Sequence, residues 1–107
     1  MVVNWYDQLE ARMIERHITF NVHPDKTTDF VRFFTDEYRP AMARSRGFVR
    51  ADLLREADNP TRYQLSFRFE DLDASAEWRT SEVHEALKPT LSALHGGQEI
   101  EAYEVVA

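Results

Sequence analysis

The sequence predicts a single α+β domain whose elements follow the order strand, helix, strand, strand, helix, strand. Three observations support this prediction. Several short segments alternate apolar and polar residues, two longer segments repeat apolar residues every three or four positions, and proline or glycine separates them. A chain of 107 residues also has the length of one domain.

The first strand and helix are predicted by a change of period. Residues 13–22 alternate as a strand does, and Pro24 ends the strand because proline cannot donate to a ladder. The threonines at 27–28 can cap a helix, which the three-and-four spacing of the following apolar residues predicts. Pro40 should bend or split this helix, and Gly47 should end it.

A hairpin should follow the first helix. Residues 48–56 and 62–69 are predicted strands, and the second of them alternates apolar and polar residues throughout. The segment 57–61 between them contains an Asn-Pro pair, which is typical of a turn. Because the connection is short, the two strands should pair antiparallel.

The second helical region and a last strand complete the pattern. A short helix should begin at Asp71 or Asp73 and run through Trp78, and Ser81 should cap another helix that Pro89 interrupts or kinks. The glycines at 96–97 should end that helix, and residues 99–106 should form the closing strand.

This element order predicts a ferredoxin-like fold, in which a four-stranded antiparallel sheet carries its helices on one face. Both sides of the last strand include apolar residues, such as Ile100 and Val105. We therefore expect helices to cover one sheet face and a second copy of the chain to cover the other, as a homodimer. The alternative is an outer face in contact with water.

Composition narrows the classes of partner and site. The formal net charge of −6 argues against nucleic acid or an anionic membrane as the main partner. The absence of cysteine excludes disulfides, thiolate metal sites and cysteine nucleophiles. No secretory signal and no apolar run of membrane-spanning length is visible, so we expect a cytoplasmic protein.

The domain proper should span residues 13–107, preceded by an N-terminal lead-in over residues 1–12. Apolar residues recur at roughly helical spacing in this lead-in, which indicates an amphipathic segment that covers a sheet edge or a partner subunit. A partly frayed terminus is the alternative.

Short motifs along most of the chain carry a family resemblance. They are Gly47-Phe48, Leu53-Leu54-Arg55, Asn59-Pro60, Phe69-Glu70-Asp71 and Ser81-Glu82-Val83-His84. In this order and register the chain resembles the antibiotic biosynthesis monooxygenase family, over about residues 13–106. The resemblance implies dimers in which two sheets close into a barrel, with an aromatic substrate or a haem held between helices and sheet.

Two activities are common in that family: oxidation of polyketide phenols by dioxygen without a cofactor, and haem binding and degradation. The haem branch resembles a pattern of asparagine, tryptophan and histidine. In this chain the matching positions hold Arg16 or a neighbour, Phe69 and Lys88. The resemblance therefore favours the first activity, and we expect no tightly bound cofactor.

His84 is the candidate catalytic residue, because it occupies the family's histidine position and an imidazole can take a phenolic proton at neutral pH. The alternative is a surface hydrogen bond or a helix cap. Trp78 is a candidate substrate-binding residue whose indole can stack on a planar ligand, with core packing as the alternative.

The remaining substrate-binding candidates lie on the predicted strands and on the first helix. His17 and Asn21 alternate along one side of the first strand, and Arg68 could continue that wall or neutralise an enolate. The same residues could instead face the dimer barrel. Phe34 and Phe69 could line a cavity, although such aromatic residues are mostly core. No spacing among the four histidines indicates a metal site.

The leading hypothesis is a small monooxygenase-like protein that oxidises an aromatic or quinone-type molecule. The rival hypothesis is a non-catalytic dimeric protein that binds a small hydrophobic ligand or responds to stress. The fold alone does not decide between them, because one fold serves many activities.

Overall fold

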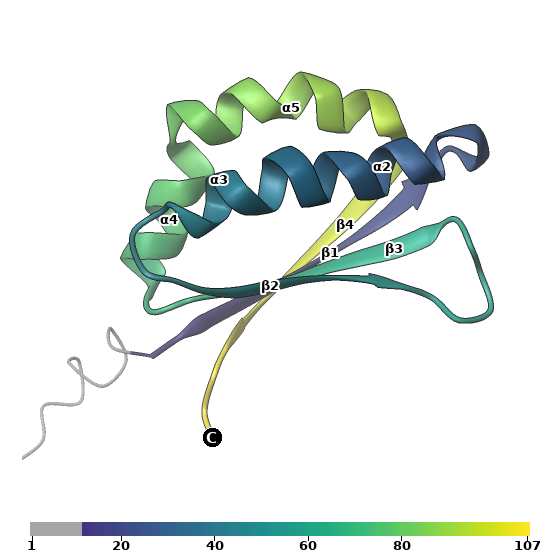
Figure 1. The fold of residues 1–107 in the computed structure, drawn as a ribbon. Helices are drawn as coiled ribbons and strands as arrows, with labels where there is room; N and C mark the ends of the chain where they lie inside the picture. Colours follow the sequence, from purple (N-terminus) through teal and green to yellow (C-terminus); the bar gives the residue numbers. More distant parts are fainter. Residues whose placement is uncertain (1–11) are drawn as a thin grey trace, which may run out of the picture.

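The computed structural model describes residues 12–107, so nearly all of the lead-in expected over residues 1–12 lies outside the described residues. The elements occur in the predicted order (Figure 1). They are β1 (Ile14–Val22), η1 (Pro24–Lys26), α2 (Thr27–Phe33), η2 (Phe34–Tyr38), α3 (Arg39–Ala43), β2 (Phe48–Arg55), β3 (Arg62–Phe69), α4 (Leu72–Thr80), α5 (Glu82–Leu94) and β4 (His95–Glu104).

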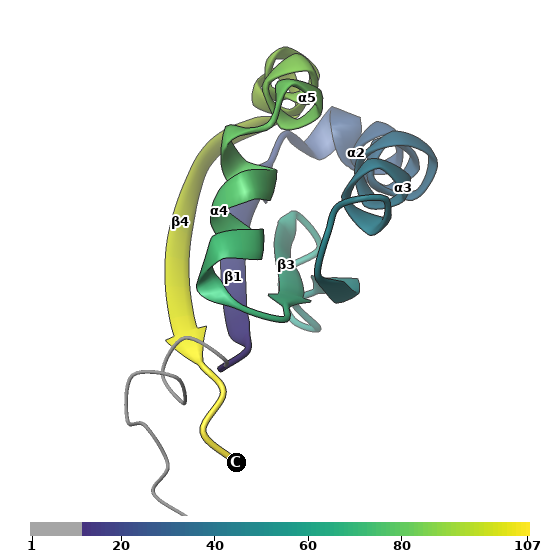
Figure 2. The ribbon, with the colours of Figure 1, turned by 90° about the vertical axis from the view of Figure 1, so that its left-hand side faces the viewer.

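The four strands form one antiparallel sheet in the order β2-β3-β1-β4, which confirms the predicted ferredoxin-like fold. Ile18 lies opposite Leu65 of β3 and Ile100 of β4, so these three apolar side chains share one face. Figure 2 shows all the helices on that same side of the sheet.

The core fills the space between this sheet face and the helices. Phe20, Leu65 and Phe69 project from the strands and are at most 2% exposed. Phe30 meets Phe20 edge to face, with the ring centroids 5.4 Å apart. Burial of such aromatic side chains is the main stabilising contribution to a domain of this size.

The predicted first helix is split into α2, the π-helical turn η2 and α3. The backbone N–H of Arg39 bonds to the carbonyl of Phe34, five residues back, and Pro40 has no N–H to continue an α-helical ladder. The break that Pro40 predicts therefore takes the form of one widened turn. The expected threonine cap is wrong: η1 leads into α2, and Lys26 precedes α2 without a side-chain cap.

The helices α4 and α5 begin where their caps predict. The Asp71 carboxylate accepts a hydrogen bond from the Ala74 N–H at 2.8 Å, and the Ser81 hydroxyl accepts one from the His84 N–H at 3.1 Å. Pro89 lies inside α5 and does not interrupt it. The strand β4 begins at His95, earlier than predicted, because the two glycines that follow are extended and part of the strand.

The outer sheet face is polar and its charges pair with one another. The Glu15 carboxylate accepts hydrogen bonds from Arg50 at 2.7 Å and Arg68 at 2.9 Å, and its second oxygen lies 2.7 Å from His17 Nε2. These contacts lower the pKa of Glu15, with the His17 hydrogen bond as the largest cause. A dimer that covers this face would bury an already paired network.

Gly47 is the one described residue with a positive φ, +77°, and an added Cβ would lie 2.6 Å from the Ala74 Cβ. We expect Gly47→Ala to lower the free energy of unfolding by at least about 1–2 kcal/mol, because a left-handed residue with a side chain is strained. Urea unfolding measures this change. Gly97→Ala is the matched control, since its Cβ would meet only Asn21 Nδ2 at 3.9 Å. Equal stability of both variants would contradict the prediction.

Candidate functional site

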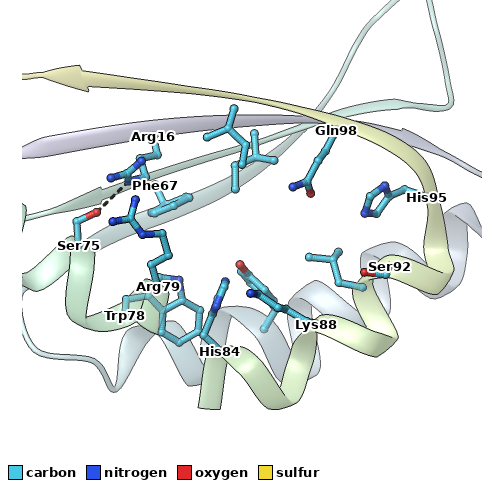
Figure 3. A pocket seen from close by; sticks show the side chains of 14 residues that line it. Arg16, Phe67, Ser75, Trp78, Arg79, His84, Lys88, Ser92, His95 and Gln98 are labelled. Carbon is cyan, nitrogen blue, oxygen red and sulfur yellow. Dashed lines mark hydrogen bonds between the residues drawn. The ribbon is translucent and has the colours of Figure 1, made fainter. Parts of the chain in front are cut away.

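A cavity of about 340 Å³ lies between the sheet and the helices α4 and α5 (Figure 3). Its sheet wall comes from β1, β3 and β4, and its helix wall comes from α4, α5 and the widened turn η2. Exposed residues such as Arg79, Lys88 and Ile100 surround its solvent side. The volume falls in the range of about 300–1,000 Å³ that is usual for small-molecule sites.

Three rings form an aromatic wall of this cavity. The Trp78 ring lies edge to face against Tyr38, at 5.6 Å between centroids, and against His84 at 5.1 Å. Trp78 and Tyr38 are each 3% exposed, so their orientation is held by packing on all sides. Burial raises the pKa of Tyr38 to about 12, and its hydroxyl therefore remains a hydrogen-bond donor at neutral pH.

Ser81 holds the tryptophan and the histidine in a common arrangement. Its hydroxyl donates to the carbonyl oxygen of Trp78 at 2.8 Å and accepts from the His84 N–H at 3.1 Å. The end of α4 and the start of α5 are thus joined through one side chain. This junction places the indole and the imidazole side by side in the cavity wall.

His84 has the properties of a proton acceptor. Its Nδ1 atom is buried and has no hydrogen-bond partner among residues 12–107. Burial is the main cause that lowers the pKa of His84 below its usual 6.5, and the nearby Lys88 ammonium lowers it further. The imidazole is therefore neutral at neutral pH and able to take a proton from a ligand.

Arg16, Arg79 and Ser75 form a positively charged end of the cavity. Arg16 projects from the helix-facing side of β1, and its Nε donates to the Ser75 hydroxyl at 3.0 Å. Burial lowers the pKa of Arg16, and the neighbouring Arg79 charge adds to this effect. Sequence reasoning considered Arg16 only as a departure from the haem pattern. Its position between Ile14 and Ile18, on the same side of the strand, was the signal that it faces inward.

The sequence-predicted residues divide into two groups. Trp78 and His84 both line the cavity. Phe69 is completely buried and packs against Phe48 and Phe67, with ring centroids 6.1 Å and 6.0 Å away. Phe34 is buried beneath the Arg39 guanidinium, 5.5 Å from its ring centroid. Both phenylalanines are therefore core residues behind the cavity rather than part of its lining.

His17, Asn21 and Arg68 lie away from the cavity. His17 and Arg68 belong to the paired network around Glu15 on the outer sheet face, and Asn21 is exposed on β1. Residues at odd positions of β1 point away from the helices, and Arg68 of β3 lies opposite Glu15 on that same outer face, so these side chains cannot reach a ligand between helices and sheet. The candidate site therefore does not include them.

The described residues show neither a metal-binding cluster nor a membrane-spanning helix. Within residues 12–107 no group of three or more histidine, aspartate or glutamate side chains is arranged to hold a metal ion. None of the described helices has the length and apolar character needed to cross a bilayer.

Comparison with known proteins assigns the family. The model of the antibiotic biosynthesis monooxygenase family matches residues 13–90. The chain belongs to this family. SnoaB, a cofactor-independent oxygenase from Streptomyces nogalater, has 26% sequence identity and a TM-score of 0.81, with 91% of this chain and 96% of SnoaB covered.

Other solved structures in the family share the fold. A candidate antibiotic biosynthesis monooxygenase from Caulobacter crescentus has a TM-score of 0.82 at 20% identity, covering 94% of this chain and 96% of that protein. A second candidate, from Nitrosomonas europaea, has a TM-score of 0.79 at 22% identity, covering 88% and 90%. No curated protein matches the sequence.

The two half-buried imidazoles of the cavity predict a pH dependence of stability. Burial lowers the pKa of both His84 and His95, so the unfolded chain binds more protons than the folded chain just below the usual pKa of 6.5. The free energy of unfolding should therefore be constant above this pH and fall as the pH decreases through the lowered values. Urea unfolding between about pH 7.5 and about pH 5.5 tests this, and His84→Gln should flatten the decrease. An equal decrease in the variant and the unmodified protein would contradict the role of His84.

Proposed function

We propose that this protein is a cofactor-independent monooxygenase that oxidises an aromatic or quinone-type molecule in the cavity between the helices and the sheet. The observation that carries the proposal is the neutral imidazole of His84 beside the buried Trp78 ring, both in the wall of a cavity of about 340 Å³. A planar ligand there has one aromatic surface to pack against and one base to lose a proton to.

The reaction fits a substrate with a CH₂ group between two aromatic rings, as in an anthrone. His84 takes a proton from the substrate, and the anion passes one electron to dioxygen. The resulting radical and superoxide combine, which forms a carbon–oxygen bond, and His84 returns its proton to the peroxide. Loss of water then leaves a carbonyl group. One atom of dioxygen ends in the product and the other in water, and the substrate supplies all four electrons.

The neighbouring side chains support the anion in this scheme. The Tyr38 hydroxyl remains protonated because burial raises its pKa to about 12, so it can donate to a substrate oxygen. The positive charges of Arg16, Arg79 and Lys88 also surround the cavity, and no carboxylate of residues 12–107 lines it. Such an environment favours an enolate or phenolate over its neutral form.

A relative of this chain also supports a cofactor-independent oxidation. SnoaB, which is similar over most of both chains, is described as a cofactor-independent oxygenase.

We also propose that the protein acts as a homodimer through its outer sheet face. Apolar side chains at the edges of that face, Leu54 and Tyr103, are 51% and 45% exposed in the single chain.

Oxygen uptake tests the proposal. Purified protein without added cofactor is mixed with a hydroxylated anthrone, and dioxygen consumption and quinone formation are followed together. We expect consumption of one dioxygen per quinone formed, above the rate with heat-denatured protein. Saturable binding of the anthrone without any increase in oxygen uptake would contradict the enzyme and favour a non-catalytic ligand-binding protein.

A further inference from the structure

Arg16 and Arg79 lie next to one another at one end of the cavity (Figure 3). Among the described residues no carboxylate lies within 4.0 Å of either guanidinium, although most other arginines of the sheet and helices are paired. Arg16 is half-buried and Arg79 is exposed at the cavity mouth, and two adjacent like charges without a counter-charge form an unfavourable arrangement at such a place.

The orientation of Arg16 is fixed by the protein. Ser75 is only 1% exposed, and its hydroxyl accepts the Nε–H of Arg16 at 3.0 Å. That contact occupies one edge of the guanidinium and leaves its terminal nitrogens without a hydrogen bond to any described residue. A guanidinium held in this way presents a planar fork of donors, which matches a carboxylate better than a single oxygen.

No negative charge of the described part of the chain competes at this site. The lining residues that it contributes are cationic, neutral polar, aliphatic or aromatic, and none of them is an aspartate or glutamate. Lys88 already pairs with Glu85 at 2.9 Å, so it offers less to a ligand than the two arginines. Arg79 and Trp78 both line the cavity from α4, so the charged end and the aromatic wall belong to the same cavity.

We propose that Arg16 and Arg79 bind a carboxylate group of the substrate, so that the substrate class is an aromatic carboxylic acid. This inference rests on the proposed function only in that it places the aromatic part of the ligand in the same cavity. The carboxylate would sit at the Ser75 end, and the rings would extend along Trp78 toward His84.

Binding of a matched pair of probes tests this site without turnover. The probes are an anthraquinone monocarboxylate and its neutral carboxamide, and affinity is measured by calorimetry and by quenching of tryptophan fluorescence. We expect the carboxylate to bind at least about tenfold more tightly than the carboxamide, since charged hydrogen bonds are the stronger ones. The preference should shrink as the salt concentration rises.

Variants separate the charge from the fold. Arg16→Gln and Arg79→Gln should each weaken carboxylate binding about tenfold and change carboxamide binding less than about twofold. Arg16→Lys keeps the charge without the planar fork and should give an intermediate loss. Circular dichroism verifies folding, and Arg32→Gln, an exposed site on α2 outside the cavity, should leave both affinities unchanged.

The outcomes distinguish this inference from the proposed function. Equal affinity of the unmodified protein for both probes, or an equal loss of both in Arg16→Gln, would overturn the carboxylate site even if the anthrone is oxidised. A clear preference for the carboxylate that is lost in the arginine variants supports the site, even if no oxygen uptake is found with any anthrone.

Discussion

Replacement of His84 by alanine is expected to lower the rate of dioxygen uptake by a factor of about 10²–10⁴, the usual contribution of a positioned general base. The imidazole is neutral because burial lowers its pKa, and it is the histidine that contacts the Trp78 ring in the cavity wall. Alanine removes the proton acceptor and leaves the Ser81 cap intact, because that cap uses the backbone N–H of His84. Steady-state oxygen consumption measures the change.

The control for this variant is His23→Ala, which removes an imidazole that lies before η1 and does not line the cavity. Its rate should equal that of the unmodified protein. In the unmodified protein the rate should fall only when the pH drops below 6.5 toward the lowered pKa of His84. Added imidazole should restore part of the activity of His84→Ala. Full activity of His84→Ala would show that another group takes the proton.

Replacement of Phe69 by alanine should lower the free energy of unfolding by about 3–5 kcal/mol. The Phe69 ring is completely buried, and it packs edge to face against Phe48 and Phe67. A domain of this size has a total stability of about 5–15 kcal/mol, so the loss is a large part of it. Urea unfolding followed by circular dichroism gives the value.

Two further variants show whether Phe69 acts through stability or through ligand contact. Leu72→Ala changes a side chain that is 56% exposed on α4, and its effect should stay within about 0.5 kcal/mol. Phe69→Leu keeps most of the buried volume and should bind an aromatic ligand almost as well as the unmodified protein. A strong loss of ligand affinity in Phe69→Leu with little loss of stability would restore Phe69 as a ligand-contacting residue.

The fold was predictable because its signals are local. The alternation from Tyr63 to Phe69 predicts a strand with the observed bounds, and Ser81 predicts the start of α5 through its hydroxyl. The predictions of element bounds are wrong where contacts between distant parts of the chain determine the local structure. The glycines at 96–97 look like a turn in sequence, yet pairing with β1 extends β4 through them. The widened turn before Pro40 is a second case, because Pro40 predicts a break in the helix but not the form that the break takes.

The candidate site was only partly predictable. Trp78 and His84 stand out because both residue types bind aromatic ligands and both lie on one helical region. His17 and Arg68 alternate with residues of the other face, and the sequence does not state which face meets the helices until the core is known. Arg16 was the missed residue, since a charge among apolar neighbours on β1 indicates an inward-facing functional group.

The widened turn η2 makes the shape of the cavity depend on chain length as well as on residue type. It accommodates one more residue per turn than a regular α-helix would. A relative shorter by one residue within η2 would close this turn to ordinary helical geometry, and the helices on either side would keep their faces toward the core because the turn absorbs the difference. The cavity wall would then change only at the turn itself, where Tyr38 lies, so a single-codon deletion there is expected to alter ligand selectivity without any substitution.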